Sequence, residues 1–147
     1  MKKRISVVTL LIVGSFTGAL AISEYRQLAA TTINYTVTEY NEDGTISDSS
    51  KVVRFCNTRG EWSETQIFAD GHLSAANGKV TPRNESLTSF PDSPRKQILD
   101  RTVVVLFDRR SEAWYDPSLH QFLKNILYTD ETRQTVRVVI EAVEIKD

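Results

Sequence analysis

Few residues in this sequence are suited to nucleophilic or metal chemistry: one cysteine, Cys56, and two histidines, His72 and His120. No G-x-S-x-G motif is present, and Cys56 stands in no recognisable catalytic context. The histidines belong to no H-x-x-x-H, H-E-x-x-H or C-x-x-C pattern, so zinc is not predicted. Because no residues can be assigned the roles of nucleophile, base and stabiliser, we expect a protein that is not an enzyme, with no catalytic residues, no metal and no cofactor.

Cys56 is expected to be a buried packing residue. It follows a strand-like run, residues 51–55, and a free cysteine behaves as a small hydrophobic side chain. A reactive thiol would need a cationic partner, for which Arg54, on the same strand face, and His72 are the candidates. A single cysteine excludes an intramolecular disulfide and leaves an intermolecular one as the alternative.

Large aromatic side chains next to turns provide the candidate ligand site. The candidates are Trp62, Phe68 and Trp114, which would line a cavity inside a curved sheet, since small-molecule sites are mostly apolar with a few polar groups. The alternative is that these residues are ordinary core and rim packing. Residual pocket volume beside them would favour ligand binding, whereas native packing density would favour a filled core.

Other sequence patterns are weak. The six glycines are scattered and form no phosphate-binding loop. Residues 41–48 carry oxygen-bearing side chains without the spacing of an EF-hand loop. The sequons at Asn34 and Asn84 matter only if the source is a eukaryote.

The residues that would position such a site lie mainly in predicted strands. Alternating β-branched and aromatic residues predict strands over 33–40, 45–56 and 61–68, with a fourth within 72–80 that is broken by Asn77-Gly78. The turns between them are spaced as in an antiparallel meander. A mobile loop is expected over 81–94 and a short helical turn near 95–100. Further strands follow at 102–107, 112–115 and 134–145.

One amphipathic helix is predicted over 117–128. Asp116 can cap it, and Pro117 suits its first position. Five apolar residues recur at the helical period, namely Leu119, Phe122, Leu123, Ile126 and Leu127. The fold class predicted is therefore α+β, with a curved antiparallel sheet and this helix packed on its apolar face.

Residues 1–21 have the pattern of a secretory signal peptide. Three basic residues precede an uncharged stretch, and Ala19 and Ala21 occupy the −3 and −1 positions of a cleavage site. The alternative is an uncleaved signal anchor. Both interpretations place residues 22–147, a single domain, outside the cytoplasm: periplasmic or secreted if the segment is cleaved, and attached to the membrane by it if it is not.

Composition narrows the function without identifying it. Residues 22–147 carry 15 basic and 19 acidic residues, a net charge of −4, which does not favour binding to nucleic acid or anionic lipid. We expect an exported non-enzymatic module that binds an apolar ligand or a cell-envelope protein. The alternative is a small structural or interaction protein anchored by its N-terminal segment, with no ligand site. In layout alone, the meander covered by a helix looks like the half-barrel periplasmic carriers of lipoproteins and lipids, although no motif carries this likeness.

Overall fold

The computed structural model describes residues 30–80 and 84–147, and these residues form one antiparallel sheet of nine strands. The strands are β1 (Thr31–Tyr40), β2 (Ile46–Cys56), β3 (Glu61–Phe68), β4 (Leu73–Lys79), β5 (Arg95–Ile98), β6 (Arg101–Phe107), β7 (Ser111–Asp116), β8 (Gln121–Tyr128) and β9 (Val136–Lys146). A short 3-10 helix, η1 (Leu87–Ser89), precedes β5. The predicted signal segment, with Ala19 and Ala21, lies outside the described residues.

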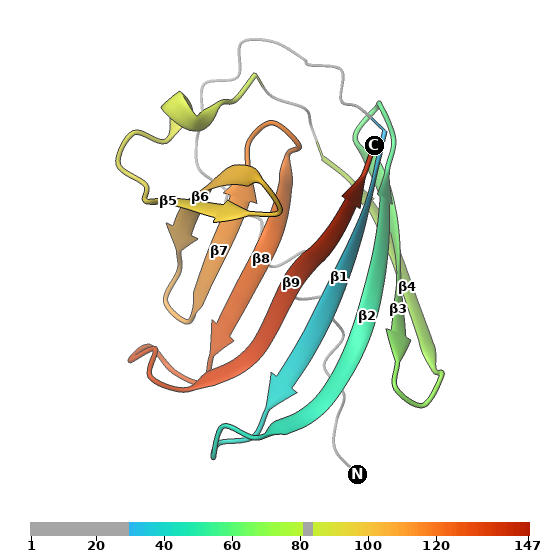
Figure 1. Cartoon of the computed structure of the whole chain (residues 1–147), viewed down its shortest axis with the longest axis vertical. Coiled ribbons are helices and arrows are strands. Elements are labelled where there is room, and N and C mark those ends of the chain that lie inside the picture. Colours follow the sequence, from blue (N-terminus) through green and yellow to red (C-terminus); the bar gives the residue numbers. More distant parts are fainter. Residues whose placement is uncertain (1–29, 81–83) are drawn as a thin grey trace.

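The strand order is β4-β3-β2-β1-β9-β8-β7-β6-β5. Two meanders, β1 to β4 and β5 to β9, are therefore joined in the middle of the sheet by the pairing of β1 with β9. Figure 1 shows the C-terminus beside the start of β1, in agreement with the pairing of Thr32 with Lys146. The antiparallel sheet predicted from the sequence is confirmed.

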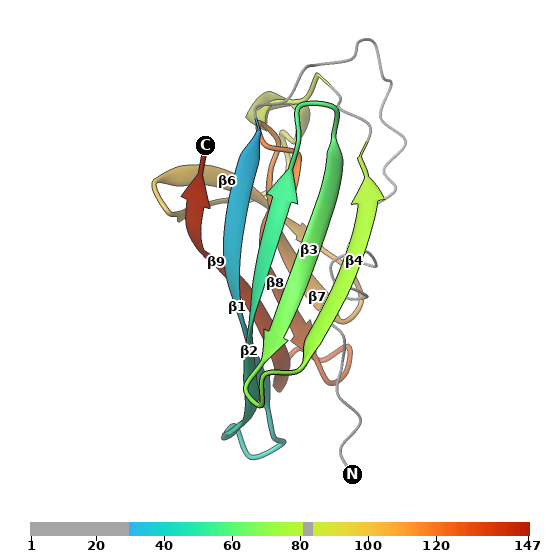
Figure 2. The ribbon, with the colours of Figure 1, turned by 90° about the vertical axis from the view of Figure 1, so that its right-hand side faces the viewer.

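The sheet bends strongly about β1 and β9. Figure 2 shows β9 and β1 to β4 side by side, with β7 and β8 behind them. A hydrogen bond of 2.8 Å from Arg54 on β2 to Gln121 on β8 crosses the bend, although β1 and β9 separate these strands in the sheet. We call the face inside this bend the inner face and the opposite one the outer face.

The inner face carries the main core. Alternate residues of β1 and β9 point into it, and the strand register aligns Tyr35 with Val52 on one side and with Ala142 on the other. The buried members of this cluster are Ile33, Tyr35, Val37, Val52, Ile98, Val103, Leu123, Val138, Ile140 and Ala142. The Tyr35 hydroxyl donates a hydrogen bond of 2.8 Å to the Phe122 carbonyl, so the largest side chain of this core has a polar partner.

The predicted helix over 117–128 is wrong, and with it the α+β class, because the described residues contain no α-helix. Asp116 therefore caps no helix, although its Oδ1 accepts hydrogen bonds from the backbone N–H groups of Ser118 and Leu119 in a turn. His120 then adopts a left-handed φ of 55°, which ends the turn. Residues 121–128 continue as β8, which runs between β7 and β9.

The apolar residues of β8 have the spacing of a helix because both faces of this strand are at least partly buried. Leu123 is buried on the inner face, while Phe122 and Ile126 are half-buried on the outer face. Apolar residues therefore occur on both faces of the strand, and some of them coincide with the helical spacing of three and four. Such a run cannot be distinguished from a helix by periodicity alone.

The region between β4 and β6 also differs in part from expectation. Residues 95–98 form β5 rather than a helical turn. Within the predicted mobile loop, residues 81–83 lie outside the described part of the chain. Arg95 donates hydrogen bonds to the carbonyls of Leu87, Phe90 and Ser93 and so connects the described remainder to β5. No helix in the described residues is long and apolar enough to cross a bilayer.

Candidate functional site

A cluster of buried polar side chains on the inner face is the main candidate site. Strand alternation directs every second residue of β2, β3 and β8 inward, and some of these positions carry polar groups instead of apolar ones. The polar members are Arg54, Glu64, Gln66, Gln121 and Asn125, each at most 5% exposed. Buried polar groups need partners, so this cluster requires a physical explanation.

Arg54 and Glu64 form the centre of the cluster. They are directly paired across β2 and β3, and Arg54 Nη2 lies 2.8 Å from Glu64 Oε1. Arg54 Nη1 donates to Gln121 Oε1 at 2.8 Å. Burial opposes the charge of Arg54, but the charge of Glu64 and its hydrogen bond help to hold the pKa of the guanidinium above its ordinary value. The site therefore contains a buried pair of opposite charges with no net charge.

This pair is incompletely satisfied. Among the described residues, neither Arg54 Nε nor Glu64 Oε2 has a hydrogen-bond partner, and the same holds for Asn125 Nδ2 further along β8. Leaving a buried donor or acceptor unpaired costs about 1–3 kcal/mol, and more for a charged group. The centre of the cluster therefore holds one buried donor and one buried acceptor that lack partners within the described residues.

Trp62 and strand β4 form the surroundings of the pair. The Trp62 ring lies under the Arg54 guanidinium, with 4.3 Å from Cζ to the ring centroid. On β4, the inward positions opposite Trp62, Glu64 and Gln66 hold Gly78, Ala76 and Ser74. We call these three residues the β4 shelf. They are half-buried and small, and at Gly78 the Trp62 ring occupies the space that a Cβ would take.

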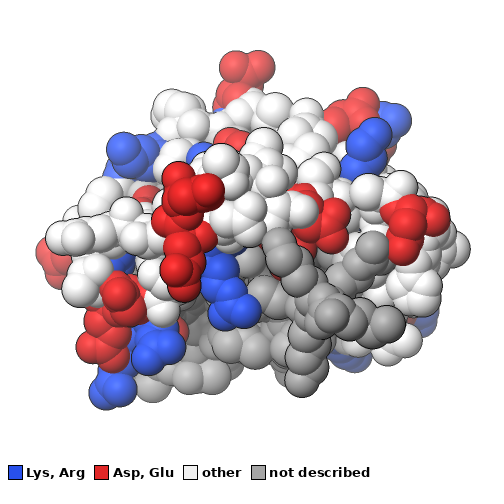
Figure 3. Space-filling model, turned by 90° about the horizontal axis from the view of Figure 1, so that it is seen from below, with Lys and Arg blue, Asp and Glu red and all other residues white. Residues whose placement is uncertain are grey.

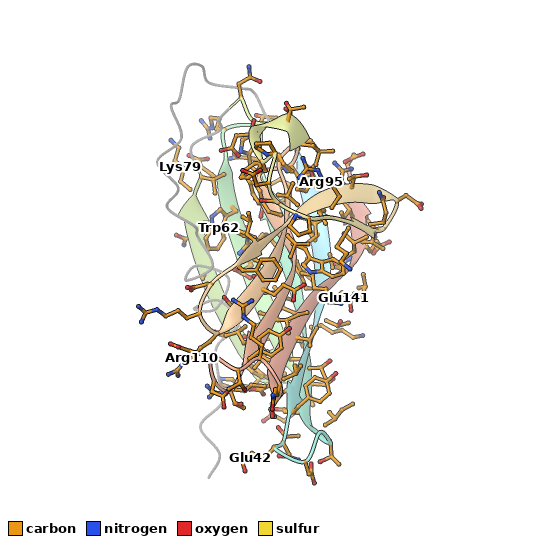
Figure 4. The ribbon with its side chains drawn as sticks, turned by 90° about the vertical axis from the view of Figure 1, so that its left-hand side faces the viewer. Glu42, Trp62, Lys79, Arg95, Arg110 and Glu141 are labelled. Atoms are coloured by element: carbon orange, nitrogen blue, oxygen red, sulfur yellow. The ribbon has the colours of Figure 1, made fainter. Side chains whose placement is uncertain are left out.

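The structure places two of the three aromatic residues predicted to line a site on one face, at opposite ends of β3. Trp62 and Phe68 share the inner face of β3 and are 8% and 7% exposed. Trp114 instead pairs with Lys124, whose ammonium lies 4.6 Å from the centroid of its ring, and donates to Glu112 Oε1. In Figure 4, Trp62 lies on the β3–β4 side of the molecule, opposite the side where Glu141, the ion-pair partner of Lys124, is labelled.

Cys56 is buried on the inner face at the end of β2, as expected from the sequence. Burial raises the pKa of its thiol from an ordinary value near 9 to about 11, and the opposing effect of Arg54 is smaller. The thiol is therefore protonated at neutral pH. Arg54, the candidate activating group, does not produce a thiolate here.

A groove of about 480 Å³ lies elsewhere, lined by residues 85–88, 100–102 and 116–118. None of the three predicted aromatic residues lines it. Two of its charged groups pair with each other: Arg101 donates to Asp116 Oδ2 and to Ser118 Oγ, and Ser118 in turn donates to Asp116 Oδ1.

A second polar contact lies behind this groove. The Tyr115 hydroxyl donates to Glu85 Oε2 at 2.8 Å, and His120 Nδ1 lies 3.9 Å from the same oxygen. Tyrosine, carboxylate and histidine together are groups used in acid–base chemistry. The distances describe a structural contact between the end of β7, the turn before β8 and residue 85.

The surface shows no strong electrostatic preference on the side seen in Figure 3, where basic and acidic side chains are interspersed. Within residues 30–80 and 84–147, no three His, Cys, Asp or Glu side chains are placed to bind a metal ion. At the sequons, Asn34 donates to Glu144 Oε2 at 2.7 Å and Asn84 is exposed.

The sequence contained a signal for the polar cluster that the interpretation above did not use. In β2, the alternation that buries Val52 and Cys56 also buries Arg54, and in β3 it places Glu64 between Trp62 and Gln66. Opposite charges at inward positions of adjacent predicted strands are candidates for a buried pair. Gln121 had no such signal, because its strand was assigned to a helix.

No protein-family model matches this chain, and no curated protein matches it significantly. The comparisons therefore assign neither a family nor an activity. Any functional conclusion rests on the geometry of the chain itself.

Proposed function

We propose that the protein is an exported, non-enzymatic binding module that holds an apolar ligand with a polar end on the inner face of its curved sheet. The single observation that carries this proposal is the buried Arg54–Glu64 pair, in which one donor and one acceptor lack partners among the described side chains. The polar end of the ligand would bind these two atoms.

The energetic argument starts from the cost of the pair. A buried ion pair is often no more stabilising than apolar side chains of similar volume, and unpaired polar atoms make it less favourable still. A ligand that supplies the missing hydrogen bonds would remove this penalty. Binding would then be strongest at the place where the free protein has buried hydrogen-bonding atoms without partners.

The β4 shelf provides the place for the apolar part of the ligand. Ser74 and Ala76 are small, half-buried residues beside Gln66 and Glu64, and the Trp62 ring, packed over Gly78, bounds them at one end. An apolar chain lying along this shelf would reach the Arg54–Glu64 pair from the β4 edge of the sheet. The combination of apolar walls with a few polar groups is that of small-molecule sites in general.

Export is supported by the pattern of residues 1–21, with cleavage after Ala21. N-terminal sequencing of protein recovered outside the cytoplasm tests this part of the proposal, and Ile22 is the expected first residue. Protein that begins at Met1 and sediments with membranes would instead support the anchored structural or interaction protein.

The ligand site is tested by two neighbouring alanines on β4. Ala76→Leu places a larger side chain on the shelf, whereas Ala75→Leu places the same side chain on the exposed outer face. Both variants are titrated with Nile red, an uncharged apolar dye, by fluorescence. Native mass spectrometry of the purified wild-type protein searches for a bound ligand from the host.

We expect wild type and Ala75→Leu to bind the dye equally and Ala76→Leu to bind it at least about tenfold more weakly, since the added side chain fills the shelf. Equal binding by all three proteins would place the dye elsewhere and contradict the site. Absence of binding to the wild type, together with no copurifying ligand, would favour a protein without a ligand site.

A further inference from the structure

We infer that the polar end of the ligand is uncharged and offers both a hydrogen-bond donor and an acceptor, as an alcohol or a carboxamide does. This inference rests on the proposed function and specifies the ligand class of the same site. It follows from the charges and the open hydrogen-bond positions of Arg54 and Glu64.

The charge argument uses the neutrality of the pair. Arg54 and Glu64 lie 2.8 Å apart, and their side chains are 6% and 0% exposed, so water screens them little. A carboxylate placed at the open Arg54 Nε would also lie near the charge of Glu64. An ammonium at the open Glu64 Oε2 would likewise lie near Arg54. A third charge of either sign would lose its hydration, and its attraction to one member of the pair would be offset by repulsion from the other.

The hydrogen-bond argument uses the two open atoms. Arg54 Nε carries an N–H that requires an acceptor, and Glu64 Oε2 is an acceptor that requires a donor. A hydroxyl group supplies both from one oxygen, and a primary carboxamide supplies them from adjacent atoms. A carboxylate offers no donor, and an ammonium offers no acceptor. Neither ion can therefore complete the pair.

The other polar side chains nearby do not alter this balance. Gln121 already accepts from Arg54, and Gln66 donates to Ser50 Oγ at 3.0 Å. Both are uncharged. Tyr35 is neutral at physiological pH because burial raises the pKa of its hydroxyl well above its ordinary value. The described surroundings thus add no charge that would favour an ionic ligand.

The inference is tested with four compounds that share a twelve-carbon chain and differ only at the polar end: dodecanol, dodecanamide, dodecanoate and dodecylamine. Each competes with Nile red on the wild-type protein at pH 7. We expect dodecanol and dodecanamide to bind at least about tenfold more tightly than either ion. A buried charged group without a matching partner lowers the affinity by more than about tenfold.

Glu64→Gln provides the decisive variant. It leaves the charge of Arg54 uncompensated, so dodecanoate should gain affinity relative to dodecanol by about tenfold or more. Glu141→Gln makes the same chemical change on the outer face, beside Lys124, and should leave the ranking unchanged. Because a lone buried charge can unfold a protein, Arg54→Gln combined with Glu64→Gln is the second variant. It restores neutrality and should keep the preference for uncharged ends.

The outcomes separate this inference from the proposed function. If all four compounds bind with equal affinity, or if dodecanoate binds best to the wild type, the inference is wrong while the binding module stands. A folded Glu64→Gln that gains no affinity for dodecanoate would also contradict it. If none of the compounds displaces the dye from a protein whose binding depends on Ala76, the inference fails without affecting the site. If Nile red itself does not bind, the proposed function fails first.

Discussion

Replacing Gly78 by alanine should destabilise the protein through a single contact. A Cβ at this position would lie 2.5 Å from Trp62 Cζ2 and 2.7 Å from Cε2. Carbon atoms in contact prefer a separation of about 3.5–4 Å, so the indole would have to move by roughly 1 Å. That movement would also disturb the stacking of Arg54 on the ring, whose separation is 4.3 Å.

Two opposing terms set the magnitude. Overpacking of a buried contact typically costs about 1–3 kcal/mol. Alanine in place of glycine restricts the unfolded chain. This raises the free energy of unfolding by about 0.4–1 kcal/mol when the backbone conformation is compatible, as it is in this strand. We therefore expect the free energy of unfolding to fall by about 1–2 kcal/mol for Gly78→Ala, measured by urea denaturation with far-UV circular dichroism.

Trp62→Phe provides the matched background, because a phenyl ring lacks the indole atoms that approach Gly78. In that background, Gly78→Ala should cost nothing or stabilise the protein by up to about 1 kcal/mol. The interaction energy of this double-mutant cycle reports the contact alone. An equal cost in both backgrounds, or no cost in the wild type, would show that the ring does not pack against β4 as described.

Three other expected outcomes concern stability. Leu123 is fully buried on β8, so Leu123→Ala should lower the free energy of unfolding by about 2–5 kcal/mol. Leu73 on β4 is 60% exposed, so Leu73→Ala should lower it by under about 0.5 kcal/mol. Similar losses of stability in thermal denaturation would contradict the assigned faces. Tyr35→Phe should lower the free energy of unfolding by about 0.5–1.5 kcal/mol because it removes the hydrogen bond from the Tyr35 hydroxyl to the Phe122 carbonyl, and an unchanged urea midpoint would refute this. The pKa of Cys56 is raised to about 11 in the folded protein, so the unfolded state releases its proton first and stability should fall between pH 9 and 11; Cys56→Ala should remove that part of the pH dependence.

The sheet was largely predictable because most strands are half-buried. In β1 and β3, inward apolar or aromatic residues alternate with outward polar ones, and this period of two predicts both strands closely. The prediction for the residues of β8 was wrong because the outer face of this strand is also partly covered. Its cap-like start at Asp116 and Pro117 forms a turn that His120 ends, and no local signal shows that the chain will leave the helical path there.

The candidate site was predictable only in part. The inward position of Trp62 follows from alternation, and so does the position of Phe68 on the same face. Trp114 could not be assigned, because a bulge at residues 114 and 115 changes the alternation of β7. The contact between Arg54 and Gln121 depends on how far the sheet bends. Bending is a property of the whole sheet and is not encoded by any one segment.

The pairing of β1 with β9 has a consequence for the order of folding. Each meander consists of hairpins between neighbouring strands, which require only short loops to close. β9, which has eleven residues, joins β1 to β8, and its inward residues Val138 and Ile140 complete the core. Until β9 pairs with them, β1 and β8 present two long unpaired edges, which are templates for pairing with other chains. The two meanders therefore become one sheet only when β9 has paired with both β1 and β8.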